Sequence, residues 1–90
     1  MYNNYMLYKY KVIVKLKDGI KDAKGEAVSS VINRLDLFSQ NANVHVGKYF
    51  EFEVQANDNI QAEKIAVDII EEVFINPILE TYEIVEVQTL

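Results

Sequence analysis

The first regular stretch of the chain alternates apolar and charged side chains. From Tyr8 to Leu16 every second residue is apolar, and lysines fill most of the positions between. A period of two predicts a β-strand with one face in the core and one face in water. Ile13 is the exception, because it is apolar but shares the face of the lysines, so we expect it on the outer face of the sheet.

Two later stretches repeat apolar residues at steps of three and four. They run from about Lys24 to Leu37 and from about Ile60 to Ile75, and this spacing predicts two amphipathic helices. At 100° per residue the apolar arc spans roughly 140° on the first helix and roughly 220° on the second. Asn76-Pro77 is expected to end the second helix, since proline disfavours helical backbone in the residue before it.

The stretch between these helices, residues 44–54, is predicted to be β structure containing a turn. A three-residue turn at 47–49 keeps the apolar side chains on one face and sets His45 opposite Glu51 on the other. A single long strand kinked at Gly47 is the alternative.

A last strand is predicted over residues 78–87, which gives the order β-α-β-β-α-β. This order predicts an α+β, ferredoxin-like sandwich in which an antiparallel sheet carries two helices on one face. Ninety residues hold a single hydrophobic core, so we expect one domain over residues 1–90, with 1–7 as an extra N-terminal segment.

Composition narrows the function classes. The net charge of −5 argues against nucleic-acid binding, which requires a basic face. There is no cysteine for a disulfide or a thiolate metal site, and neither a signal peptide nor an apolar run long enough for a membrane span is present. We therefore expect a cytoplasmic protein that binds neither nucleic acid nor membrane.

The sequence offers little for catalysis. His45 is the only imidazole, and no serine near it lies in a nucleophile-elbow motif. The Gly47-Lys48 pair does not complete a phosphate loop, because Ala42 replaces the first glycine and Tyr49 replaces the final Ser or Thr. We predict no catalytic, cofactor-binding or metal-binding residues, and the surplus of apolar surface favours an oligomer or a larger complex.

Three segments in register resemble the PurS family, the small subunit of phosphoribosylformylglycinamidine (FGAM) synthase. They are YKVIVKLKDGIKDAKGEAV (8–28), VHVGKYFEFEV (44–54) and INPILETYEI (75–84). Asp18 stands where the family usually has proline, and His45 stands where a basic residue, commonly arginine, is usual.

The resemblance implies a non-catalytic subunit of an ATP-dependent, glutamine-hydrolysing ligase of purine biosynthesis. Such subunits form homodimers or homotetramers, bridge the glutaminase PurQ to the synthetase PurL, and support ammonia transfer between them. It implies no cofactor on this chain, with ATP and magnesium used by the full enzyme. The candidate interface residues are Ile13, Arg34, His45, Lys48, Tyr49, Asn76, Pro77 and Tyr82.

Two other functions stay open from the residues. One is a ferredoxin-like regulatory module that binds a small molecule near the glycine-containing loop at 18–25. The other is an acylphosphatase-like hydrolase, which needs an arginine in a phosphate loop. Arg34, the only arginine, falls in a predicted helix instead.

Overall fold

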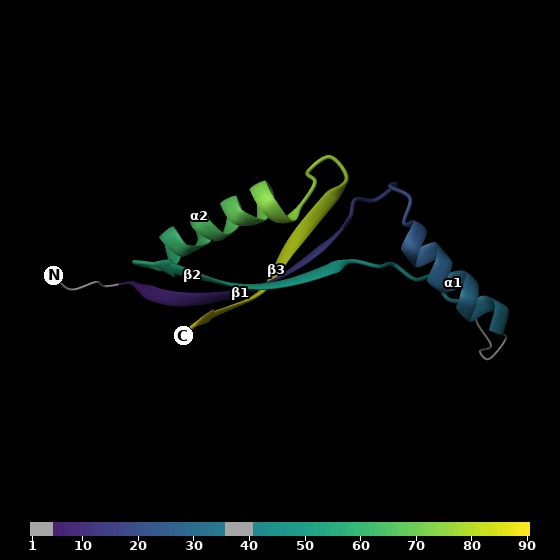
Figure 1. Ribbon diagram of the computed structural model, residues 1–90, viewed down its shortest axis with the longest axis horizontal. Coiled ribbons are helices and arrows are strands. Elements are labelled where there is room, and N and C mark those ends of the chain that lie inside the picture. Colours follow the sequence, from purple (N-terminus) through teal and green to yellow (C-terminus); the bar gives the residue numbers. More distant parts are fainter. Residues whose placement is uncertain (1–4, 36–40) are drawn as a thin grey trace.

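The sheet has three antiparallel strands, with the N-terminal strand in the middle. A computed structural model describes residues 5–35 and 41–90. Its elements are β1 (Met6–Leu16), α1 (Ala23–Leu35), β2 (Lys48–Ala56), α2 (Asn59–Ile69), a π-helical turn η1 (Ile70–Phe74) and β3 (Glu80–Thr89). The strand order is β2-β1-β3, and the molecule is long and thin, 65 × 27 × 14 Å (Figure 1).

The alternation predicted for β1 is confirmed. Tyr8, Tyr10, Val12 and Val14 are each at most 2% exposed, and the residues between them face the other side of the sheet. The pairing of β1 with β3 contains a register shift between Lys11 and Val12. A shift of this kind is a β-bulge, which increases the local twist of the strands.

α2 packs on the face that holds these buried residues. Ala62 and Ala66 are 0% exposed, so their small side chains let the helix backbone approach the strands closely. The Phe74 ring at the end of η1 stacks on Phe50 of β2 with the ring centroids 4.3 Å apart. The Asp58 carboxylate caps the start of α2 by accepting a hydrogen bond from the amide of Gln61 at 2.8 Å.

The predicted class, an α+β fold with an antiparallel sheet and two helices, is confirmed. The helices differ in their relation to the sheet, however. α2 lies along one face, whereas α1 is carried beyond the end of the sheet on the chain that leaves β1 and returns to β2 (Figure 1). We call α1 and the returning residues 41–47 the arm.

The hairpin predicted at residues 47–49 is wrong. Lys48 already opposes Val14 of β1, so the chain runs from residues 41–47 straight into β2 without a turn. His45 therefore does not face Glu51. The alternative, a single strand that continues through Gly47, is closer to the structure. Among the described residues, however, 41–47 pair with no strand.

Candidate subunit-interface site

The returning segment of the arm is fastened to α1 through alternate backbone amides. The amides of Ala42, Val44 and Val46 donate to Asn33 Oδ1 at 2.8 Å, Ser29 Oγ at 2.7 Å and Asp22 Oδ2 at 2.9 Å, respectively. The three acceptors lie seven and four residues apart, on one stripe of the helix. Because α1 and Asp22, the residue just before it, supply these acceptors, the segment satisfies these donors without a neighbouring strand.

Asp22 accepts hydrogen bonds from both α1 and the returning segment. Its Oδ1 accepts the Gly25 amide at 2.8 Å, which caps the first turn of α1, while Oδ2 accepts the Val46 amide. The two backbone hydrogen bonds, that of Gly25 first, hold the pKa of the Asp22 carboxyl below its usual value. His45 Nδ1 lies 3.7 Å from Oδ2, and its ring is 77% exposed, so His45 adds only a weak polar contact to Asp22.

Gly25 is required by this close approach. A Cβ on Gly25 would overlap the carbonyl oxygen of Val44, a backbone atom that cannot rotate away. Gly25 is itself buried although it lies in an arm that has left the sheet. The stripe that faces residues 41–47 is therefore already packed.

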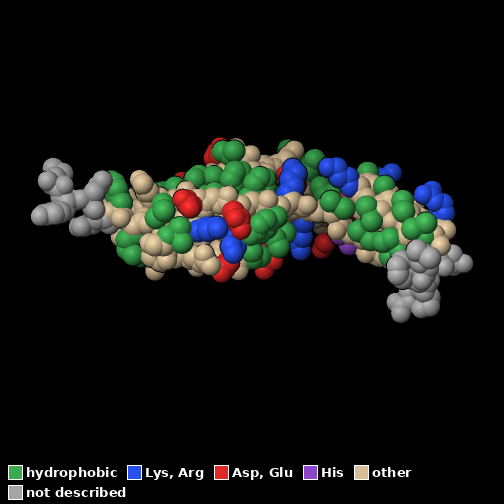
Figure 2. All heavy atoms as spheres, turned by 60° about the horizontal axis from the view of Figure 1, so that its bottom comes forward, with side chains coloured by type: hydrophobic (Ala, Val, Ile, Leu, Met, Phe, Trp, Pro, Cys, Tyr) green, Lys and Arg blue, Asp and Glu red, His purple; other side chains and the backbone are tan. Residues whose placement is uncertain are grey.

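The opposite stripe of α1 has no such cover among the described residues. Val28, Val31 and Leu35 are 42%, 43% and 53% exposed, and they recur at steps of three and four along one side of the helix. Arg34 is exposed in the last turn, where a positive charge interacts favourably with the helix dipole. The placement of Arg34 in a helix, away from any phosphate loop, is as predicted. Figure 2 shows hydrophobic side chains gathered at this end of the molecule, with Lys and Arg around them.

Three of the predicted residues meet at the junction between the sheet and the arm. Glu80 accepts the Asn76 amide at 2.8 Å and lies 3.5 Å from the Lys48 ammonium. The carbonyl of Pro77 accepts a hydrogen bond from Lys17 Nζ at 2.6 Å. These contacts fix the turn before β3 against the start of β2 and the end of β1.

The remaining candidates occupy the sheet. Ile13 and Tyr49 are directly opposed on β1 and β2 and are 39% and 54% exposed, which places an apolar pair on the outer face as the sequence predicted for Ile13. Tyr82 of β3 donates its hydroxyl to Glu71 at 3.2 Å. Burial, and then the neighbouring Glu71 carboxylate, raise the pKa of Tyr82.

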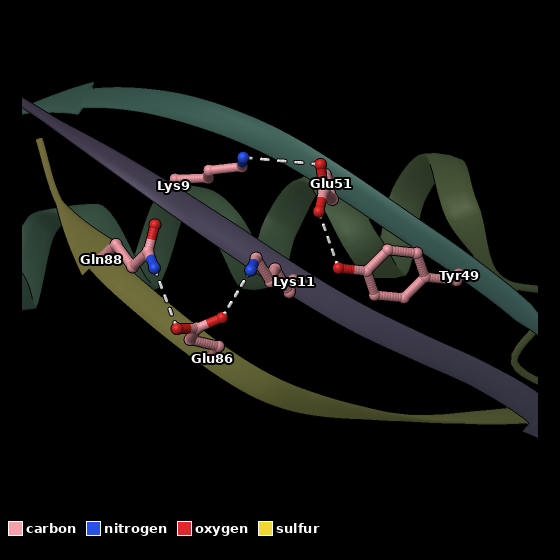
Figure 3. Close-up of polar contacts among 6 residues, drawn as sticks. All are labelled: Lys9, Lys11, Tyr49, Glu51, Glu86 and Gln88. Carbon is pink, nitrogen blue, oxygen red and sulfur yellow. Dashed lines mark hydrogen bonds and ion pairs between the residues drawn. The ribbon is translucent and has the colours of Figure 1, made fainter.

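The rest of the outer face around Ile13 carries ion pairs and hydrogen bonds between side chains (Figure 3). Lys11 contacts Glu86 on β3 at 2.7 Å, and Lys9 contacts Glu51 on β2 at 3.5 Å. The Tyr49 hydroxyl donates to Glu51 at 2.8 Å, and this hydrogen bond is the main cause that lowers the pKa of Glu51. The two ion pairs join β1 to the strand on each side of it.

Sequence reasoning missed the residues that hold the arm. Asp22, Ser29 and Asn33 had no predicted role in holding the returning segment. Their spacing of 22, 29 and 33 on one polar stripe was the available signal. It could not identify the acceptors' partner, because backbone amides leave no trace in the sequence.

Neither a metal centre nor a membrane-crossing helix is found in the described ranges. No three His, Cys, Asp or Glu side chains of residues 5–35 and 41–90 converge on one point. No helix of these ranges has the length and apolarity to span a bilayer.

The sequence of this chain matches a known protein family. The family model for PurS, phosphoribosylformylglycinamidine (FGAM) synthase, matches residues 9–88. The chain belongs to the PurS family. It is thus a subunit of FGAM synthase, an enzyme of purine biosynthesis, as the resemblance implied.

Individual PurS proteins match over nearly their whole length. The PurS subunit of FGAM synthase from Thermotoga maritima is 29% identical over 80 residues, which cover 89% of this chain and 96% of that protein. The Archaeoglobus fulgidus PurS subunit is 31% identical over 74 residues, 82% of this chain and 91% of that protein.

Solved PurS structures share the fold. Thermus thermophilus PurS superposes with a TM-score of 0.76 at 30% identity, covering 93% of this chain and 98% of that one. A chain from the structure of PurLQS from Thermotoga maritima gives a TM-score of 0.76 at 27% identity, with the same coverage. That PurS protein was therefore solved in an assembly with PurL and PurQ.

Proposed function

We propose that the chain is a non-catalytic subunit that bridges a PurL-like synthetase and a PurQ-like glutaminase, and that it acts as a homodimer or homotetramer. The observation that carries the proposal is the whole-length PurS match combined with an apolar stripe on α1 that no described residue covers. An exposed apolar stripe on an amphipathic helix is typical of a surface that packs against another protein.

Bridging has a physical use in this reaction. Ammonia released by a glutaminase becomes protonated in bulk water and then no longer acts as a nucleophile. A desolvated junction between the two larger subunits keeps ammonia neutral until it reaches the acceptor. A bridging subunit contributes to this through packing and shape complementarity, which require no perturbed catalytic side chain.

ATP and magnesium belong to the synthetase partner in this proposal, since the described residues of this chain provide no cluster to hold the metal. We also infer a cytoplasmic location, from the sequence. The candidate interface residues form three surfaces: the arm with Arg34 and His45, the junction with Lys48, Asn76 and Pro77, and the sheet with Ile13, Tyr49 and Tyr82.

Reconstitution tests the proposal. Synthetase and glutaminase subunits are mixed with and without this chain, and FGAM formation is measured with either glutamine or an ammonium salt as nitrogen donor. We expect the chain to raise the glutamine-dependent rate strongly and to leave the ammonium-dependent rate almost unchanged. Full glutamine-dependent turnover by the two larger subunits alone would refute the proposal.

A further inference from the structure

A cavity opens at the base of the arm, between the residues that leave the sheet and those that return to it (Figure 1). β1 and β2 are paired as far as Val14 and Lys48, and the same register two residues further on would set Leu16 opposite Val46. The Val46 amide instead donates to Asp22, and the two chains separate here. The cavity between them has a volume of about 330 Å³. Cavities that bind small ligands start at about 300 Å³, so this one accepts a small metabolite.

Charged side chains of both signs line this cavity. Lys15 lies near the end of β1, Lys17 comes just after it, and Asp18 follows in the glycine-containing loop. Lys15 and Asp18 take part in no ion pair among the described residues. Lys17 donates to the Pro77 carbonyl and keeps two further N–H donors. Asp22 is less available, because each of its oxygens already accepts a backbone amide. The charged groups left for a ligand are thus two ammonium groups and one carboxylate.

Apolar side chains supply another part of the cavity wall. Leu16 is half-buried, and Ile20 and Val46 are each 37% exposed. Leu16 and Ile20 belong to the residues that leave the sheet, whereas Val46 belongs to the returning segment. A ligand in the cavity therefore contacts both sides of the base of the arm. Ligand sites typically combine an apolar wall with a few polar groups that fix the orientation of the ligand.

A free α-amino acid matches these three kinds of group. Its carboxylate accepts hydrogen bonds from lysine ammonium groups, and its own ammonium donates to an aspartate carboxylate. An aliphatic side chain on the ligand would cover the apolar wall. An inorganic anion matches less well, because it would be repelled by Asp18 and Asp22 and would leave the apolar wall in water.

We propose that the cavity at the base of the arm binds a free α-amino acid with an aliphatic side chain. The carboxylate of the ligand lies at Lys15 and Lys17, its ammonium lies at Asp18, and its side chain packs on Leu16 and Val46. This site goes beyond the bridging function and does not depend on it, because all of its residues belong to this chain.

Titration of the full chain, followed by heteronuclear NMR, tests the binding. L-leucine is the probe. N-acetyl-L-leucine and L-leucinamide are matched controls, because the first lacks the ammonium and the second lacks the carboxylate. We expect L-leucine to shift the amide resonances of Gly19, Ile20 and Val46 with a dissociation constant on the order of 1 mM, since the site is open to water. Each control should bind at least about fivefold more weakly. No shift at these amides, or equal binding of the three compounds, overturns the proposal.

Substitution of the aspartate provides the second measurement. Asp18→Asn should weaken L-leucine binding about fivefold and abolish the preference for L-leucine over N-acetyl-L-leucine, because the partner of the ligand ammonium is gone. The preference over L-leucinamide should remain, since the lysines are intact. Asp68→Asn removes the same charge from an exposed position on α2 and should change neither preference. Circular dichroism checks that both variants stay folded. A retained preference over the N-acetyl compound in Asp18→Asn overturns the proposal.

The reconstitution assay separates the two proposals. A chain that restores glutamine-dependent synthesis but binds no L-leucine refutes the amino-acid site alone. A chain that binds L-leucine with the expected preferences but restores nothing supports the amino-acid site and refutes the bridging function.

Discussion

Replacing Gly25 by alanine has two opposing effects: it raises the helix propensity of α1, and it disturbs the packing of the arm. Alanine is favoured over glycine in a helix interior by about 1 kcal/mol, so α1 on its own would become more stable. The new Cβ, however, would overlap the backbone carbonyl of Val44 and crowd the Asp22 carboxylate. Whether the substitution stabilises or destabilises the arm depends on whether residues 41–47 can move away without losing their hydrogen bonds.

The geometry indicates that they cannot. The Val44 carbonyl must move by roughly 1 Å to reach ordinary van der Waals contact. The Val44 amide is held by Ser29 at 2.7 Å, and such a displacement breaks a hydrogen bond of that length. Overpacking costs about 1–3 kcal/mol and the lost hydrogen bond about 1 kcal/mol. After the propensity gain, the arm loses about 1–3 kcal/mol.

Amide hydrogen exchange resolved by residue is the appropriate assay, since opening of the arm does not require unfolding of the sheet. We expect the Val44 amide to exchange roughly tenfold faster or more in Gly25→Ala, and the amides of β1 to be unaffected. Gly19→Ala is the matched control, because a Cβ there meets no atom within 4 Å and only strains a loop residue with φ of 84°. Unchanged or slower exchange at Val44 in Gly25→Ala would refute this account of the arm.

Three further predictions concern the core and the charges. The pKa of Asp22 is lowered in the folded chain, so its carboxylate stabilises the arm at pH values above the usual aspartate pKa of about 3.9, and this contribution is lost as the pH falls through the lower folded value. The Val46 amide should therefore lose its protection from hydrogen exchange as the pH falls through that range. Asp22→Asn should remove this pH dependence. Ile70→Ala, at a side chain that is 0% exposed, should cost about 2–5 kcal/mol in urea unfolding, whereas Val73→Ala, at one 71% exposed, should cost little. Glu86→Gln breaks the exposed pair with Lys11 and should leave the melting temperature unchanged within error, so a clear drop would show that the outer face stabilises the fold.

The elements that pack within one chain were predictable from the sequence. The alternation around β1 and the three- and four-residue steps of α2 both record burial against a neighbour in the same chain. The extent of the second helix was also close, although it ends in the π-helical turn η1 at Phe74 before Asn76-Pro77. Such periodicity is strong because a core excludes polar side chains from one face.

The hairpin at residues 47–49 failed for an identifiable reason. Parity arguments assume that an extended segment satisfies its backbone groups with a strand, and they therefore search for a strand partner. Here the acceptors are the side chains of Asn33 and Ser29 in α1 and of Asp22 just before it, which a pattern of apolar residues does not reveal. The segment stays extended without a ladder, and the turn is not needed.

The exposed apolar residues show a second thing that a sequence pattern does not establish. Periodicity correctly gave α1 an apolar face, but a pattern states only that a face is buried, and it does not state whose surface buries it. Val31 on α1 and Val87 on β3 both carry the sequence signature of core residues, yet each is more than 40% exposed in a single chain. Residues that read as core and are found exposed are where a chain depends on another copy or another subunit. For a subunit that we propose to act by bridging, that mismatch is a more direct guide to the interaction surface than any motif.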